Sequence, residues 1–188
     1  MGSLIAEPFC GQLLGDFGAE VLKTEEPLDG DPMRRWGPVA HEGHGLWWPS
    51  LARNKKSIAV DLRSADGQSI DRRIVREVDV VNENFKRGQL ESWGLGYDDL
   101  SSLNPRLVMV RVSGFGQDGP YARRAGFGSI AEAVGGLRYI SGHPEAAPSR
   151  FGISIGDQVA ALFATMGTLL ALRERDQSGT GQMVDVAI

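Results

Sequence analysis

The chain has 188 residues, of which 41% are hydrophobic and 23% charged, and its formal net charge is -4 at pH 7. This composition is typical of one ordinary globular domain. The acidic balance gives no reason to expect nucleic acid or an anionic membrane as a partner. The single cysteine, Cys10, excludes an internal disulfide framework and indicates a reducing, cytoplasmic compartment.

The most apolar stretch runs from Val159 to Leu172. It is shorter than the roughly 20 residues that a membrane-spanning helix needs. The first residues, MGSLIAEPFCGQLLG, lack the basic leader and the long apolar core of a secretory signal. We therefore expect no membrane partner and no export.

Glycine and proline divide the chain into segments whose apolar residues recur with helical or strand periodicity. Helices are expected over 8–17, 64–78, 97–105, 129–137 and from Asp157 to about 178, and strands over 19–25, 57–62, 79–85, 107–115 and 182–188. Ser64 is in position to cap the second helix. The alternation predicts an α/β fold, with a mainly parallel, Rossmann-like sheet flanked by helices.

Two irregular stretches interrupt this alternation. Residues 29–50 are too many for a tight connection and are rich in Trp and Arg, and residues 114–128 form a glycine-dense loop directly after a strand. Ligands of open parallel sheets bind beyond the carboxyl ends of the strands. Both stretches are therefore candidates for a ligand-facing surface.

Common catalytic motifs are absent or incomplete. The histidines of HEGH, His41 and His44, lie three residues apart and have no third ligand nearby, so a metal site is not expected. GFG at 114–116 continues into Gln-Asp-Gly-Pro rather than a helix, so the dinucleotide fingerprint fails. No phosphate-binding G-x-x-x-x-G-K-[ST] motif occurs, and no Ser–His or Cys–His constellation supports triad chemistry.

Asp157 stands between Gly156 and the apolar stretch. An acidic residue at the start of a helix is most often a cap for its backbone N–H groups. A carboxylate at that position is also a potential nucleophile, favoured in its ionised form by the helix dipole. The residues alone leave both interpretations open.

The segments LLGDFGAEVLKTE, RNKKSIAVDLR, DVVNENFKRG, WGLGYDDL, NPRLVMVRVSGFGQDGPY, GGLRYISGHP, GISIGD and GTGQMVDVA occur in this order. Together they resemble the class III CoA-transferase family (the CaiB/BaiF group), which also contains α-methylacyl-CoA racemases. The resemblance runs from about residue 3 to the last residue. It implies that residues 1–188 are a fragment of the large domain, without the small second domain, the returning C-terminal part and a first strand. The expected assembly of the full-length protein is an interlocked homodimer.

The resemblance implies that Asp157 is the catalytic nucleophile. It would take the acyl group from an acyl-CoA as a mixed anhydride, become an aspartyl-CoA thioester, and pass CoA to a carboxylic acid acceptor. Coenzyme A and acyl-CoA are then substrates, and no tightly bound cofactor is expected. The wording of GGLRYISG and GISIGD is most similar to members that use succinyl-CoA and dicarboxylic acids.

The resemblance also gives the residues expected to contact CoA, with Lys86 as the phosphate-binding cation. They are Val60, Arg63, Asn84, Phe85, Lys86, Gly126 and Phe127. Two positions depart from the family pattern: Ser92 replaces an arginine, for which Arg87 is a possible substitute, and Glu7 replaces a small residue.

Two alternatives remain. A racemase needs a histidine and an aspartate where this chain has Phe127 and Gly128, so racemisation is disfavoured. Glu132 is an alternative base for that reaction, although an ordinary helix residue is the more common explanation. The last alternative is a catalytically incompetent CoA-binding fragment.

Overall fold

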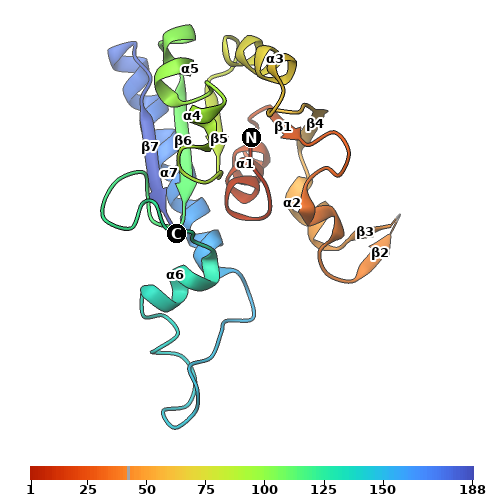
Figure 1. Cartoon of the computed structure of the whole chain (residues 1–188), viewed down its shortest axis with the longest axis vertical. Coiled ribbons are helices and arrows are strands. Elements are labelled where there is room, and N and C mark those ends of the chain that lie inside the picture. Colours follow the sequence, from red (N-terminus) through yellow and green to blue (C-terminus); the bar gives the residue numbers. More distant parts are fainter. Residues whose placement is uncertain (42) are drawn as a thin grey trace.

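The computed structural model describes residues 1–41 and 43–188. Its strands form two parallel sheets and one short antiparallel pair (Figure 1). The strands are β1 (Val21–Glu25), β2 (Val39–His41), β3 (His44–Gly45), β4 (Lys55–Ala59), β5 (Val80–Glu83), β6 (Val108–Ser113) and β7 (Met183–Ala187). β1 pairs with β4, and β5, β6 and β7 form the second sheet in that order. The predicted α/β fold with parallel strands is confirmed, with the strands divided between two sheets.

Helices lie around these sheets. They are α1 (Ala6–Asp16), the 3-10 helix η1 (Pro32–Arg35), α2 (Trp47–Ala52), α3 (Ala65–Val75), α4 (Gln89–Ser92), α5 (Tyr97–Leu103), α6 (Gly128–Val134) and α7 (Ile155–Ser178). Ser64 caps α3 as predicted, because its Oγ accepts a hydrogen bond from the N–H of Gly67 at 3.0 Å.

Residues 29–50 contain elements that the sequence did not predict: η1, β2, β3 and α2. They are too short to show a clear periodicity. Met33 and Leu51 are buried there, with Trp47 and Trp48 packed against them, and the Arg34 guanidinium lies 3.7 Å from the centre of the Trp48 ring. The prediction that HEGH holds no metal lies outside the described residues, because the side chains of His41 and His44 are not described.

The strand expected over 57–62 is displaced in the structure. β4 covers Lys55–Ala59, so Val60 and the residues up to Arg63 follow its carboxyl end. The shift has a packing reason: Val60 and Leu62 are buried in the core cluster that also holds Val75 of α3. Their apolar side chains had indicated a strand, but both residues belong to the turn that leads into α3.

Helix α7 packs on the second sheet through small side chains. Ala160, Ala161 and Ala164 are buried together with Val110 and Val112 of β6. Alanines allow the helix axis to approach the sheet closely, which fixes the start of α7 beside the carboxyl ends of β6 and β7. This packing positions Asp157.

The opposite face of α7 carries large apolar side chains that are exposed in this chain: Val159, Leu162, Phe163, Met166, Leu169 and Leu170. The helix has 24 residues and a mean hydropathy of 1.5 in its most apolar window, of which 28% is buried. By length and composition alone this helix is able to cross a membrane. Core helices of water-soluble proteins often have the same length and composition. The prediction of insufficient length concerned residues 159–172 alone, and the helix that contains them is longer, Ile155–Ser178. The absence of a membrane partner stays a prediction.

Candidate active site

Asp157 is the third residue of α7 and not its cap. The helix begins at Ile155, and the capping position is taken by Ser154, whose side chain makes no capping hydrogen bond. The cap interpretation of Asp157 is therefore wrong. Its carboxylate lies in the first helical turn, where the backbone N–H groups have no intrahelical acceptor and favour a negative charge.

The surroundings of Asp157 raise the pKa of its carboxyl group above the ordinary value. Burial is the largest cause, and the neighbouring negative charge of Glu132 is the second. The backbone N–H of Asp157 itself and the positive charge of Arg150 act in the opposite direction. The result is a half-buried carboxylate that is more basic than one in water, which strengthens it as a nucleophile.

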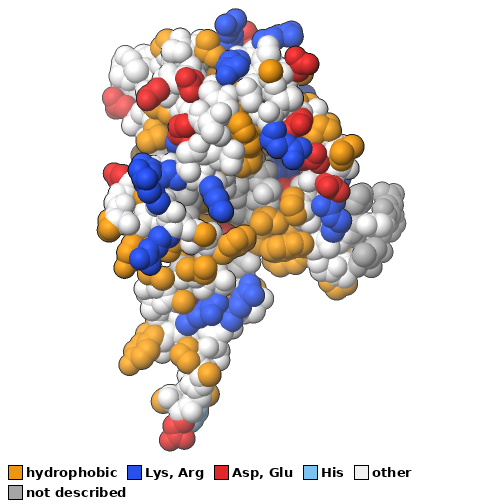
Figure 2. Space-filling view, viewed as in Figure 1, with side chains coloured by type: hydrophobic (Ala, Val, Ile, Leu, Met, Phe, Trp, Pro, Cys, Tyr) orange, Lys and Arg blue, Asp and Glu red, His pale blue; other side chains and the backbone are white. Residues whose placement is uncertain are grey.

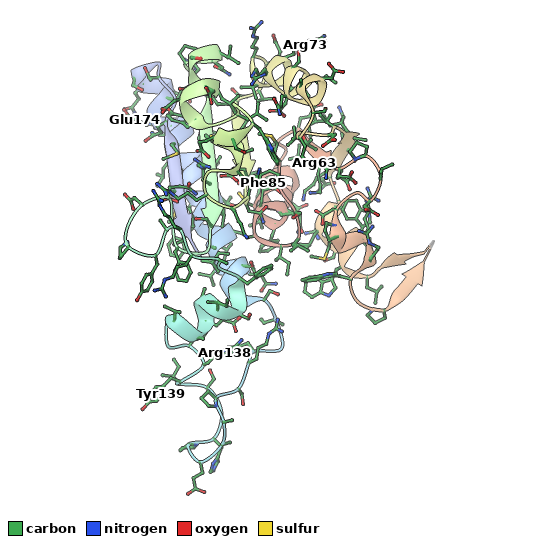
Figure 3. The ribbon with its side chains drawn as sticks, in the orientation of Figure 1. Arg63, Arg73, Phe85, Arg138, Tyr139 and Glu174 are labelled. Atoms are coloured by element: carbon green, nitrogen blue, oxygen red, sulfur yellow. The ribbon has the colours of Figure 1, made fainter. Side chains whose placement is uncertain are left out.

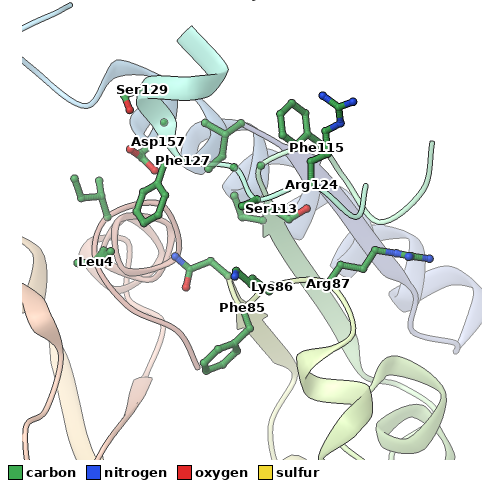
Figure 4. A pocket seen from close by; sticks show the side chains of 18 of the residues that line it. Leu4, Phe85, Lys86, Arg87, Ser113, Phe115, Arg124, Phe127, Ser129 and Asp157 are labelled. Carbon is green, nitrogen blue, oxygen red and sulfur yellow. The ribbon is translucent and has the colours of Figure 1, made fainter. Parts of the chain in front are cut away.

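The carboxylate faces a cavity of about 660 Å³ at the carboxyl ends of β5 and β6 (Figure 4). Asn84, Phe85 and Lys86 line it directly after β5. Asp157 lies beside Phe127 on one side of the cavity, while Phe85 and Lys86 lie across from it. The site thus occupies the strand-end position that ligands of parallel sheets favour.

The two ends of the glycine-dense loop that lines this cavity approach each other through glycines. A Cβ placed on Gly114, after β6, would lie 2.5 Å from the Cα of Gly126, and the converse distance is also 2.5 Å. A side chain at either position would separate the backbones, because real Cβ atoms do not come so close to another carbon. The glycine-dense loop predicted as a ligand surface therefore folds back on β6 and brings Phe127 over the cavity.

Gly128 makes a similar contact with the carboxylate itself. A Cβ at this position would overlap Oδ2 of Asp157. The first residue of α6 therefore has to lack a side chain for Asp157 to keep its observed position. No histidine lines this cavity among the described residues.

A second cavity, of about 430 Å³, adjoins the first. Val60 and Arg63 line it, and Phe85 and Ser3 line both cavities. Figure 3 shows Phe85 and Arg63 between the two groups of strands. The Arg63 guanidinium is already paired, at 2.8 Å from Oδ1 of Asp61 and 3.0 Å from Oε1 of Glu26.

Asn84 and Phe85 are held rigidly between the cavities. The amide of Asn84 accepts a hydrogen bond from the N–H of Ser3 at 2.9 Å and donates one to its carbonyl at 2.8 Å. The Phe85 ring packs edge-on against Trp93, with ring centroids 5.4 Å apart. These contacts fix the wall that the two cavities share.

Comparison with known proteins identifies the family of this chain. The sequence model of CoA-transferase family III matches residues 1–188. The chain belongs to this family. A relative from Chloroflexus aurantiacus, succinyl-CoA–D-citramalate CoA-transferase, is 60% identical over 188 residues, which are 100% of this chain and 47% of that protein. A relative from Agrobacterium fabrum, succinate–glutarate CoA-transferase, is 38% identical over 100% of this chain and 48% of its own length.

A solved structure has the same fold. The crystal structure of a CaiB/BaiF family protein from Brucella suis superposes with a TM-score of 0.95 at 38% identity, over 100% of this chain and 50% of the other. The chain thus spans about half the length of the family III relatives it matches. The predicted family and fold are confirmed, whereas the roles of individual residues remain predictions.

The structure gathers the residues predicted for this family III site in two groups. Asn84, Phe85, Lys86, Gly126 and Phe127 line the larger cavity with Asp157, and Val60 and Arg63 line the second one. Ser92 lines neither cavity, and its hydroxyl donates to the carbonyl of Gln89 at 2.7 Å. Arg87, the suggested substitute for an arginine at position 92, does line the larger cavity.

Sequence reasoning missed Arg150 and Ser154, which also line the larger cavity. They come from the segment between α6 and α7 that extends away from the sheets and returns to them (Figure 1). This segment has no periodic pattern. Only the fact that it directly precedes Asp157 in the sequence indicated that it lies near the site. The sequence analysis considered Glu132 as an alternative base and as an ordinary helix residue. In the structure it is 4% exposed and lies on α6 one turn beyond Gly128.

Proposed function

We propose that the whole protein is a CoA-transferase that moves CoA from succinyl-CoA to a second dicarboxylic acid, with Asp157 as the nucleophile. The observation that carries the proposal is the position of its carboxylate: it lies at the N-terminal turn of α7 and faces a cavity that continues past Phe85 into a second one. Family membership and the printed names of the relatives, which act with succinyl-CoA, citramalate, malate or glutarate, support the reaction and its substrate class.

The proposed reaction exchanges one bond at a time. The Asp157 carboxylate attacks the thioester carbonyl, the C–S bond breaks, and a mixed anhydride and CoA thiolate result. The thiolate then attacks the Asp157 carbonyl, releasing succinate and leaving an aspartyl-CoA thioester. The acceptor carboxylate repeats the two steps in reverse order, so one difficult exchange becomes a series of easier ones. The N–H groups of the first turn of α7 are the nearest donors for the oxyanions that form.

The charges of the two cavities suggest how CoA lies. Lys86 and Arg87 are exposed at the end of β5 and suit the phosphates. The second cavity is richer in carboxylates than in cations, and these carboxylates belong to Glu25, Glu26, Asp29, Asp31 and Asp61. Such a lining repels phosphate but accepts hydrogen bonds from hydroxyl and amino groups. We therefore assign the nucleoside part of CoA to the second cavity and the pantetheine arm to the passage beside Phe85.

The assembly and location of the protein belong to the proposal as well. An interlocked homodimer in a cytoplasmic setting is the arrangement that the resemblance implies, with no tightly bound cofactor. The exposed apolar face of α7 supports an interface with another protein segment at this helix, because large exposed apolar surfaces usually mark an interface.

The test uses the full-length protein with succinyl-CoA and a panel of acceptors: citramalate, malate, glutarate and the monocarboxylate butyrate. We expect transfer to at least one dicarboxylate, and a loss of about 10³-fold or more in Asp157→Asn, because the variant lacks the nucleophile. Transfer that persists in Asp157→Asn contradicts the proposal.

The racemase alternative is tested in the same preparation. A chiral 2-methylacyl-CoA in deuterated water should gain no deuterium at its α-carbon, because Phe127 occupies the position of the base and carries no titratable group. Deuterium incorporation that depends on Asp157 would instead establish a racemase.

A further inference from the structure

The cavity that Asp157 faces is strongly basic. Five basic residues line it, against the single carboxylate of Asp157: Lys86, Arg87, Arg123, Arg124 and Arg150. On the face shown in Figure 2, the charged side chains around the middle of the molecule are mostly basic, whereas acidic ones gather mainly in the upper half. The site is therefore built to receive several negative charges at once.

These cations differ in their position relative to the reacting carboxylate. Lys86 and Arg87 follow β5, and Figure 4 shows them across the pocket from Asp157, on the side where the second cavity begins. The Arg124 guanidinium is held over the ring of Tyr121, 4.3 Å from its centre. Figure 4 shows Lys86, Arg87 and Arg124 apart from Asp157.

Arg150 differs because it reaches the cavity from the segment that leads directly into α7, the helix that carries Asp157. It lies in the segment that leads into α7, and its positive charge lowers the pKa of the Asp157 carboxyl group. No ion pair joins its guanidinium to an acidic side chain within the described part of the chain. It is thus a cation in the same cavity as Asp157, with its hydrogen-bond donors available to a ligand.

The substrate class supplies a matching anion. A succinyl group on the thioester or on Asp157 keeps one free carboxylate, separated from the reacting carbonyl by two methylene groups. A dicarboxylic acceptor brings the same second carboxylate. A guanidinium binds a carboxylate with two parallel hydrogen bonds, which fixes the orientation of the acid as well as its charge.

We propose that Arg150 binds the distal carboxylate of the succinyl group and of the dicarboxylic acceptor, and so makes the site selective for dicarboxylic acids. This inference rests on the proposed function, because it names the group that reads the substrate of that reaction. It also gives the segment between α6 and α7 a role: the segment closes the acyl end of the cavity and carries the selecting side chain.

The experiment measures binding without turnover, in full-length protein that carries Asp157→Asn. Dissociation constants are compared for succinyl-CoA and for butyryl-CoA, which has the same chain length but no distal carboxylate. Adding Arg150→Gln should weaken succinyl-CoA binding on the order of 10²-fold and leave butyryl-CoA within about threefold. The matched control is Arg123→Gln, because Arg123 lines the same cavity. This variant should change the dissociation constants of both ligands by the same factor.

A parallel loss for both ligands in Arg150→Gln, or no loss for either, would overturn the inference, since Arg150 would then not read the distal carboxylate. Arg150→Ala in the same background gives a second measurement: added guanidinium should restore succinyl-CoA binding, and a failure to restore it would also count against the role. Failure of the proposed function appears separately, as the absence of transfer by the unchanged protein, and the binding comparison decides the role of Arg150 in either case.

Discussion

At the scale of single residues, Gly128 leaves room for the reacting carboxylate. A side chain there would overlap Oδ2 of Asp157. We expect Gly128→Ala to shift the carboxylate and to lower kcat about 10- to 100-fold in the full-length protein, because small displacements of a reacting group carry large penalties. Steady-state transfer assays measure the change.

Gly152→Ala is the matched control for this prediction. A Cβ at position 152 meets no atom within 4 Å, so activity should stay unchanged. Equal activities of the two alanine variants would show that the contact at Gly128 has no part in positioning Asp157.

Glu132 tests the electrostatic environment of the same carboxylate. It is buried on α6, with Oε2 at 3.7 Å from Nε of Arg138, and its negative charge contributes to the raised pKa of Asp157. The nucleophile must be ionised, so activity falls as the pH drops through that pKa. Removing the neighbouring charge in Glu132→Gln lowers the pKa of Asp157, and the acid limb of the kcat/KM profile, which reports the free protein, should move to lower pH.

The pH profile is compared with that of Glu145→Gln, which removes an exposed carboxylate from the segment between α6 and α7. That control should keep the original limb. A limb that stays in place in Glu132→Gln, or moves to higher pH, would mean that Glu132 does not act on Asp157.

At the scale of elements, β5 and β6 are joined by a buried ion pair. Glu83 and Arg111 are register partners in the parallel ladder, with Nε of Arg111 at 2.6 Å from Oε1 of Glu83. Glu83 is fully buried, and burial raises the pKa of its carboxyl group despite the arginine. The sequence VMVRVS predicted a buried strand, but it did not show what would compensate the charge of its arginine.

Arg111→Met should destabilise the protein by about 3–5 kcal/mol at neutral pH, because it removes the cation that pairs with the buried Glu83 and with the half-exposed Glu91. The folded-state pKa of Glu83 is raised and rises further in this variant, so the protonated form is favoured in the folded state. Its contribution to stability is then present at low pH and is lost as the pH rises through the folded-state pKa. Urea denaturation across pH should show the deficit shrinking in acid.

The double variant Glu83→Gln, Arg111→Met separates the pair from the packing. It should recover most of the lost stability, since no charge remains buried. A deficit that is as large in the double variant, or independent of pH, would assign the effect to the packing of the arginine stem instead.

At the scale of the whole molecule, the fold was largely predictable and the site only in part. The long elements were found because α3 has a cap signal at Ser64 and β6 an apolar run that only Arg111 interrupts before Ser113. The division into two sheets was not found, because strand order depends on contacts between distant segments that periodicity does not report. The short elements between residues 29 and 50 were missed for lack of periodicity.

The residues of the site were also predicted only in part. Asn84 and Lys86 were predicted through the resemblance to the family, and the structure places them in the cavity at the carboxyl end of β5. Arg150 and Glu132 were not assigned to the site, because their positions depend on how the segment around α6 folds back toward α7. The sequence showed that α7 is apolar but not which of its faces packs on the sheet, and the structure assigns that contact to the face of small side chains.

The most direct test of the account is to find the covalent intermediate on Asp157. Full-length protein is incubated with succinyl-CoA, quenched in acid and digested, and the peptides are analysed by mass spectrometry. We predict a hydroxylamine-sensitive CoA or succinyl adduct on Asp157, absent in Asp157→Asn. An adduct on another residue, or one that persists in Asp157→Asn, would contradict the central claim.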